Sequence, residues 1–249
     1  MISHHPDIGW LQAFAAGELP TSLALAVALH LEACPACQQQ VHDHEAWLAR
    51  NSWHADSKTP LVADLPTEQW DAIFESIVTQ PESLAAPPQP APPQLQWQGQ
   101  SLTLPRALRH LTIPPWQRIG KIGRARLALD GAGPERTSLL AIAPGTAIPE
   151  HSHPGYEVTV VLAGGIEDQG AHLGAGEFLL WEGAASHAPR SAEGCFCLTV
   201  MAAPLRFTRG WARLLNGCSD LLYLAIRTAP GDRHPVTNVP VVPRSTARQ

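Results

Sequence analysis

Residues 30–37 read HLEACPAC, and this stretch predicts a metal site. Thiolates and imidazoles are the ligands that a tetrahedral zinc ion prefers. His30 and Cys34 are four residues apart, so they share one face of a helix. Pro35 disfavours a helical Cys34 and suits the first position of a new helix. Cys34 and Cys37 therefore flank a corner between two helices, where both can face one ion.

A fourth ligand has to come from outside this stretch. His5 is the first choice and the adjacent His4 is the alternative, because neighbouring residues project differently and only one of them can point at the ion. A reduced CxxC pair without metal is the competing interpretation, but HxxxCxxC is more specific than CxxC alone. We expect a small zinc-held helical unit that binds another protein rather than performing chemistry.

Composition limits the possible classes of protein. A chain of 249 residues with 45% hydrophobic residues can form one large or two modest domains. A net charge of −5 without a long basic run disfavours direct binding to nucleic acid. Five cysteines without a regular framework indicate a reducing compartment. The first residues do not resemble a signal peptide, and no apolar run approaches the ~20 residues that span a bilayer. We therefore expect a cytoplasmic protein without a membrane-spanning segment.

The first 80 residues carry helical patterns. Helices are predicted from residues 6–17, from Pro20 through 33, from Pro35 through 50, and over 66–78. The last of these has an apolar stripe at i, i+3, i+4 and i+7, formed by Trp70, Ile73, Phe74 and Ile77. A Pro-rich segment follows at once. The stripe is predicted either to pack on the zinc-held helices or to lie in a groove of a partner protein.

After about residue 94 the chain changes to short β-rich segments separated by Gly and Pro, with no alternating helices. This pattern predicts a sandwich or a barrel. The fold class expected is α+β, a small all-α zinc-binding domain followed by a β-barrel or jelly-roll domain. The expected boundaries are 1–80 for the helical domain, 81–94 for a Pro-rich linker, 95–215 for the β domain and 216–249 for a tail of unassigned role.

A second metal constellation lies within residues 145–165, GTAIPEHSHPGYEVTVVLAGG. His151 and His153 are two apart and face the same side of a strand. Glu157 follows four residues later, and His187 lies thirty residues beyond it. Imidazoles and a carboxylate inside a barrel suit a divalent transition metal.

This stretch closely resembles the first cupin motif, with its HxH, its Glu and a Gly at each end. The second motif is matched at Gly176 and His187, whereas Glu182, Ala184 and Ser191 replace the expected Pro, Gly and Asn. The resemblance implies a cupin barrel with His151, His153, Glu157 and His187 as its metal ligands.

Residues 1 to about 215 together resemble the ChrR family of anti-sigma factors, which join a zinc-binding anti-sigma domain to a cupin-like domain. The resemblance rests on His5, the FAAGELP segment, and His30 with the CxxC pair, beside the cupin motif. It implies zinc on His5, His30, Cys34 and Cys37, and a second zinc on the four cupin ligands.

The resemblance also implies a partner and a signal. The partner is an extracytoplasmic-function sigma factor, which the apolar stripe over 66–78 contacts, and the signal is oxidative, singlet oxygen or an organic peroxide. The expected protein is a regulator with no catalytic residues. The alternative is a metal-dependent cupin dioxygenase whose N-terminal segment is regulatory.

Overall fold

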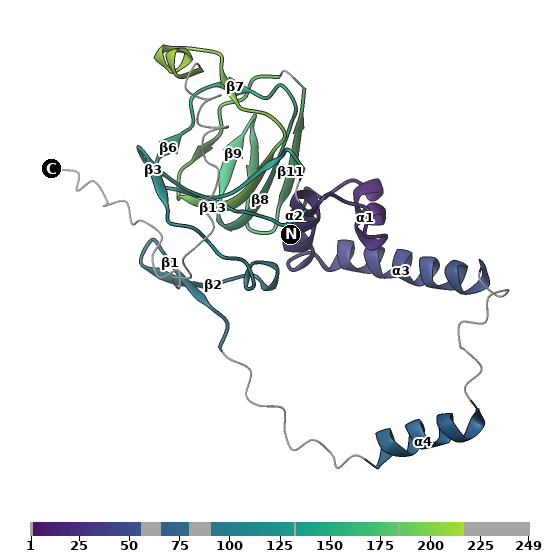
Figure 1. The fold of residues 1–249 in the computed structure, drawn as a ribbon. Coiled ribbons are helices and arrows are strands. Elements are labelled where there is room, and N and C mark those ends of the chain that lie inside the picture. Colours follow the sequence, from purple (N-terminus) through teal and green to yellow (C-terminus); the bar gives the residue numbers. More distant parts are fainter. Residues whose placement is uncertain (1, 56–65, 80–90, 132, 184, 217–249) are drawn as a thin grey trace.

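The computed structural model describes residues 2–55, 66–79, 91–131, 133–183 and 185–216 (Figure 1). Most of the expected Pro-rich linker and the tail after residue 216 lie outside these ranges. The order of elements is helices first and strands afterwards, which confirms the predicted α+β class.

Four α-helices form at the predicted places: α1 (Ile8–Ala15), α2 (Thr21–Leu31), α3 (Pro35–Ala55) and α4 (Thr67–Val78). The side chain of Asp7 caps α1 by accepting a hydrogen bond from the backbone N–H of Gly9 at 2.8 Å. Pro35 is the first residue of α3, so Cys34 lies in the corner between α2 and α3. Among the described residues, no helix has both the length and the apolarity to cross a bilayer.

The β domain opens with a hairpin of β1 (Gln94–Trp97) and β2 (Gln100–Thr103). Its two turn residues, Gln98 and Gly99, both have positive φ, which gives the tight turn that suits the twist of the flanking strands. A short 3₁₀ helix, η1 (Arg106–Leu108), follows the hairpin.

Two larger antiparallel sheets form the barrel. The strand order of the six-stranded sheet is β11 (Phe178–Glu182), β8 (Tyr156–Gly164), β13 (Cys195–Met201), β5 (Arg136–Ile142), β4 (Ile122–Arg126) and β3 (Gln117–Ile119). The order of the four-stranded sheet is β10 (Ala171–Leu173), β9 (Ile166–Asp168), β12 (Arg190–Ser191) and β6 (Thr146–Ala147). A small pair of β14 (Arg206–Phe207) and β7 (His151–Ser152) precedes the 3₁₀ helix η2 (Trp211–Leu215).

The central strands of the six-stranded sheet are buried on both faces. On β13, Phe196 and Leu198 belong to the core that the helices share, whereas Cys195 and Cys197 belong to a second core inside the barrel. Successive side chains of a strand point to opposite faces, so this sheet is a wall with a different core on each side.

The helices pack directly on that wall. Helix α2 contacts β8, β13 and η1, and its buried residues Ala26 and Val27 are completely inaccessible to solvent. The core formed by α1–α3 is therefore continuous with the outer core of the barrel. Figure 1 shows these helices against the side of the barrel that carries β8 and β11.

Candidate metal centres and an exposed helix

The structure brings the N-terminal candidates together. Donor atoms of His5, His30, Cys34 and Cys37 all lie within 4.8 Å of one another. His5 Nδ1 is 3.4 Å from the Sγ atom of each cysteine, and His30 Nε2 is 3.3 Å from Cys37 Sγ. His30 and the two cysteines are buried, whereas His5 is at the surface.

These separations suit zinc. A tetrahedral ion with Zn–S near 2.3 Å and Zn–N near 2.05 Å places its sulfur and nitrogen ligands about 3.5 Å apart. The three nitrogen–sulfur distances are within 0.2 Å of that value, at 3.3 to 3.4 Å. The donor set, two sulfurs and two imidazole nitrogens, is also the one that zinc selects.

Burial opposes a charge on two members of this cluster, His30 and Cys37. Burial lowers the pKa of His30 despite its hydrogen bond to Gly176, so the ring is neutral at pH 7. Burial and a hydrogen bond with Cys34 raise the pKa of Cys37 to about 12. A cation that binds here as a thiolate complex therefore has to displace the thiol proton of Cys37.

The structure separates His4 from His5. His4 points away from the cysteines and contacts Glu177 of the barrel, with 3.0 Å between Nδ1 and Oε2. Only His5 joins the cluster, so the geometry selects the first choice made from the sequence over its alternative.

The second set of candidates also converges. Donor atoms of His151, His153, Glu157 and His187 lie within 4.8 Å of one another, and all four residues are buried. His153 Nε2 is 2.9 Å from His187 Nε2 and 2.8 Å from Glu157 Oε2. His187 Nε2 is 3.8 Å from the same carboxylate oxygen. Ligands about 2.1 Å from a divalent ion and roughly 90–110° apart have separations near 3.0–3.4 Å, so the set fits such an ion.

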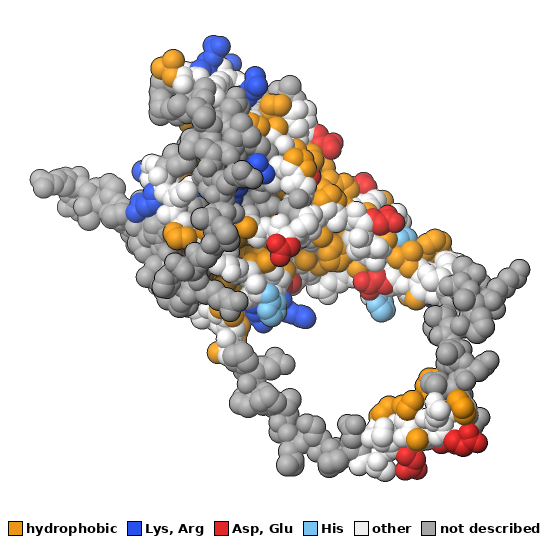
Figure 2. Space-filling model, in the orientation of Figure 1, with side chains coloured by type: hydrophobic (Ala, Val, Ile, Leu, Met, Phe, Trp, Pro, Cys, Tyr) orange, Lys and Arg blue, Asp and Glu red, His pale blue; other side chains and the backbone are white. Residues whose placement is uncertain are grey.

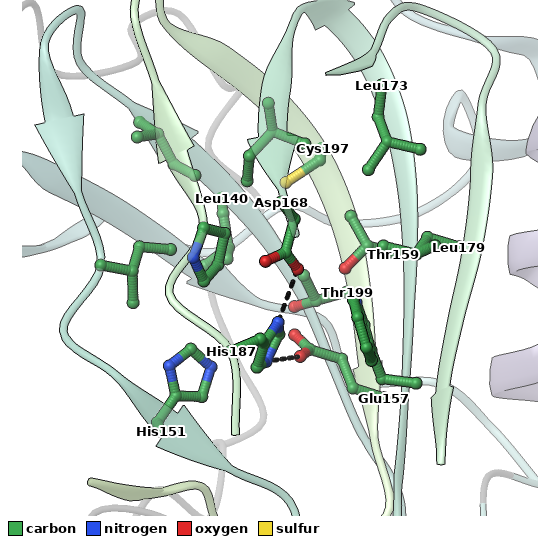
Figure 3. A pocket seen from close by; sticks show the side chains of 15 residues that line it. Leu140, His151, Glu157, Thr159, Asp168, Leu173, Leu179, His187, Cys197 and Thr199 are labelled. Atoms are coloured by element: carbon green, nitrogen blue, oxygen red, sulfur yellow. Dashed lines mark hydrogen bonds and ion pairs between the residues drawn. The ribbon is translucent and has the colours of Figure 1, made fainter. Parts of the chain in front are cut away.

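Hydrogen bonds orient two of these imidazoles. His187 Nδ1 donates to Asp168 Oδ2 at 2.6 Å, and His151 Nδ1 donates to the carbonyl of Pro149 at 2.8 Å. In each ring this leaves Nε2 with the lone pair that a metal needs. Figure 3 shows His187 between Asp168 and Glu157, with both contacts drawn.

The charge in this site is concentrated on Glu157. Burial opposes its ionisation, but a hydrogen bond from His153 and the neighbouring imidazoles outweigh burial and lower its pKa. Burial lowers the pKa of His151 to about 4. A buried carboxylate among three imidazoles is suited to bind a cation.

A small cavity adjoins the ligands inside the barrel (Figure 3). It leaves about 40 Å³ for water-sized molecules, which is enough for one or a few waters or a similarly small guest. His151, Glu157 and His187 form part of its wall, and the rest is mostly apolar, with Thr159, Thr199 and Asp168 as polar exceptions. Trp181 also lines it and lies against His187, with 4.8 Å between the ring centroids.

Cys197 reaches this cavity from β13, and Cys195 belongs to the same inner core. The two thiols are 1% and 0% exposed, respectively. A hydrogen bond with Cys195 and burial raise the pKa of Cys197 well above that of a free thiol. Cys197 is therefore a thiol at neutral pH, which slows its reaction as a nucleophile.

The apolar stripe of α4 is exposed to solvent. Trp70, Ile73, Phe74 and Ile77 are 45, 43, 66 and 63% accessible. The neighbouring Val78 is also exposed. Figure 2 shows hydrophobic side chains along one side of this helix and acidic side chains on the other. A contiguous exposed apolar face on a helix is typical of a surface that binds another protein.

Three residues in or beside the sites were not found from the sequence. Asp168 orients His187, Trp181 covers its ring, and Glu177 holds the segment that leads to His5. Their partners lie 6 to 174 residues away in the chain, as in the Ser3–Glu177 hydrogen bonds, and no spacing motif predicts such pairs.

Comparisons with known proteins agree with this arrangement. Residues 105–204 match the family described as ChrR cupin-like domain, and residues 8–38 match one described as putative zinc-finger. The chain is 29% identical over 227 residues to the anti-sigma-E factor ChrR of Cereibacter sphaeroides, covering 86% of this chain and 97% of that protein.

The comparison with solved structures gives two matches of different strength. One is the crystal structure of Rhodobacter sphaeroides SigE in complex with the anti-sigma ChrR, with a TM-score of 0.57 and 24% identity over 81% of this chain and 100% of that chain. The other is an RmlC-like cupin protein of Ralstonia eutropha JMP134, with a TM-score of 0.37 and 20% identity over 47% of this chain and 87% of that chain.

The two matched segments cover both halves of the chain, and they contain seven of the eight ligand candidates. The relative from C. sphaeroides aligns over nearly its whole length. In this chain a segment that matches a putative zinc-finger precedes a ChrR cupin-like domain, and the chain as a whole is similar to the anti-sigma-E factor ChrR.

Proposed function

We propose that this protein binds and inhibits an extracytoplasmic-function sigma factor in the cytoplasm, and that its cupin-like domain senses oxidants to release that partner. The observation that carries the proposal is the exposed apolar face of α4. The chain also has a cluster of two histidines and two cysteines that fits zinc. The names of the relative, an anti-sigma-E factor, and of the solved SigE complex support the choice of partner.

The side chains of α4 indicate what kind of surface on the sigma factor would bind this helix. Trp70 and Phe74 supply large apolar anchors, the type of residue that dominates binding energy at interfaces. The opposite side carries Glu68, Asp71 and Glu75, and residues 67–78 include no Lys or Arg. The proposed binding surface on the sigma factor is therefore an apolar groove with a basic margin.

Zinc bound to His5, His30, Cys34 and Cys37 would fix the corner between α2 and α3 and the N-terminal segment against it. A bound metal would add its binding free energy to the folding of this small helical segment. Zinc at this site is therefore proposed to be required for inhibition. Zinc is also proposed at the cupin site, because three imidazoles and a carboxylate suit a divalent transition metal.

The proposed sensing site is the cupin constellation with its cavity. The cavity admits only a small molecule, and its wall combines imidazoles, an indole and the thiol of Cys197. Singlet oxygen and small organic peroxides are the proposed signals. The dioxygenase alternative fits this small cavity less well than a regulatory role does, and the relative from C. sphaeroides is named as a regulator.

The experiment measures the affinity of the full-length protein for an extracytoplasmic-function sigma factor encoded in the same genome. The double variant Trp70→Ala/Phe74→Ala should bind at least 100-fold more weakly, because two interface anchors are together worth about 3 kcal/mol or more.

The matched control is Trp47→Ala, since Trp47 on α3 is also an exposed tryptophan, 52% accessible. This variant should retain the native affinity. Undiminished binding by the α4 variant, or no binding by the native protein to any such sigma factor, would refute the proposal.

A further inference from the structure

The turn that leads into β11 contacts the N-terminal metal site at two places. Gly176 contacts His30 directly, and Glu177 contacts the two residues that precede His5. The turn belongs to the cupin-like domain, yet Gly176 and Glu177 face the helical segment. The carbonyl oxygen of Gly176 accepts a hydrogen bond from Nδ1 of His30 at 2.7 Å. His30 is completely buried. The carbonyl fixes the tautomer of that ring and leaves Nε2 to face Cys37.

Glu177 holds the other histidine through the backbone. Its carboxylate, in a side chain only 7% exposed, accepts hydrogen bonds from the N–H of Ser3 at 3.1 Å and of His4 at 2.6 Å. The Ser3 hydroxyl and the His4 ring donate to it as well. These are the two residues before His5, so their anchoring sets where the His5 ring can reach.

Neighbouring contacts make this junction rigid. The N–H of Phe178 donates to the carbonyl of His4 at 3.1 Å, and the Phe178 ring packs edge-on against His30. Gly176 has φ of +90°, and a β-carbon there would lie 2.6 Å from Ile2 and 2.9 Å from the side chain of Ala33. Glycine therefore suits this position because of its positive φ and because the side chains of Ile2 and Ala33 pack closely against it.

We propose that Gly176 and Glu177 of the cupin-like domain are positioning residues of the N-terminal metal site, so that the zinc affinity of the helical segment depends on the cupin-like domain. This inference rests on the proposed zinc binding and adds to it a physical route between the two domains. Outer hydrogen bonds to metal-binding histidines typically change metal affinity 10- to 100-fold when they are removed.

The test uses Co²⁺ as the probe in the full-length protein. Co²⁺ bound by thiolates has an intense sulfur-to-metal absorption band, and the cupin set has no thiolate among its four candidates. The band therefore reports the N-terminal site alone, and competition with Zn²⁺ gives its zinc affinity. Glu177→Gln should weaken that affinity at least 10-fold.

The matched control is Glu182→Gln at the other end of β11, where the glutamate is exposed. It should bind zinc as the native protein does. Native affinity in Glu177→Gln overturns the inference while leaving the proposed zinc site intact. If the native protein shows no thiolate band, the zinc site and the inference fail together.

A second variant removes a donor of the same contact, the backbone N–H of Ser3. Ser3→Pro lacks the backbone N–H that donates to Glu177, and Ser3 is exposed, so the barrel is left unchanged. If Glu177→Gln does not fold by circular dichroism, Ser3→Pro decides: a loss of zinc affinity of several-fold or more supports the inference, and unchanged affinity overturns it.

Discussion

His187 donates its Nδ1 proton to Asp168 across 2.6 Å, and the two side chains are each only 3% exposed. The carboxylate keeps the Nε2 lone pair of the ring directed at His153 and Glu157. Asp168→Asn should therefore weaken metal binding at the cupin site 10- to 100-fold. Metal content after dialysis against a weak chelator measures the effect.

The control for this variant is the adjacent residue. Glu167 is on the same strand as Asp168, and Glu167→Gln alters only an exposed ion pair with Arg190 of β12, so this variant should retain the metal. Equal metal loss in both variants, or in neither, would show that the Asp168–His187 contact does not orient a ligand.

Cys34 and Cys37 should control the stability of the helical segment. In Cys34→Ser/Cys37→Ser the thiolate ligands are gone, so added zinc should raise the melting temperature less than it does in the native protein. For the native protein, zinc at 100 times its dissociation constant adds about 2.7 kcal/mol. Calorimetry with and without chelator measures the difference. His42→Ala, an exposed residue of α3, is the control and should respond to zinc normally.

Zinc binding at the N-terminal site should release protons. The pKa of Cys37 is about 12 without metal, so this thiol is protonated at pH 7 and has to ionise when zinc binds. Affinity should therefore fall as the pH is lowered and rise as it is increased. Titration calorimetry in buffers of different ionisation enthalpy should detect at least one proton released per zinc. No proton release would place the zinc on other ligands.

Glu32 joins the helices to the β domain at a second point. Its carboxylate accepts hydrogen bonds from the N–H groups of Arg106 and Ala107, both at 2.8 Å, and so caps η1. Glu32→Ala should cost about 1 kcal/mol of unfolding free energy, as other cap deletions do. Urea denaturation measures it. Glu45→Ala on the exposed face of α3 should be neutral, and an equal loss there would argue against a capping role.

The thiols inside the barrel should be protected from reagents. Cys195 and Cys197 are buried, and the pKa of Cys197 is raised, so alkylation by iodoacetamide at pH 7 should be slower than in the urea-unfolded protein by orders of magnitude. Peptide mass spectrometry follows each residue separately. Alkylation at the unfolded rate would mean that the inner core opens readily.

Most of the ligand candidates and helix boundaries could be predicted from residues that are close together in the sequence. HxxxCxxC and HxHxxxE are each confined to a few residues, so the motif itself places the ligand types on adjacent turns or strands. The helix boundaries followed from Asp7, Pro20, Pro35 and Pro66, whose backbone preferences act on their immediate neighbours.

Hydrogen bonds between residues that are far apart in the sequence could not be predicted in the same way. The hydrogen bonds of Glu177 to Ser3, or of Asp168 to His187, depend on which strand ends meet in the folded barrel. A lone Glu after a Gly, or an Asp at a strand end, has no distinctive pattern. The choice between His4 and His5 likewise required the position of Glu177, which draws His4 away from the cysteines.

Strand β11 has a consequence for communication within the molecule. The two residues just before it, Gly176 and Glu177, contact His30 and the segment that leads to His5, and Trp181, near its other end, covers a histidine of the second centre. Five residues of extended chain span about 17 Å. A disturbance at the Trp181 end thus has an unbroken covalent path of about one strand length to the cysteine-bearing corner.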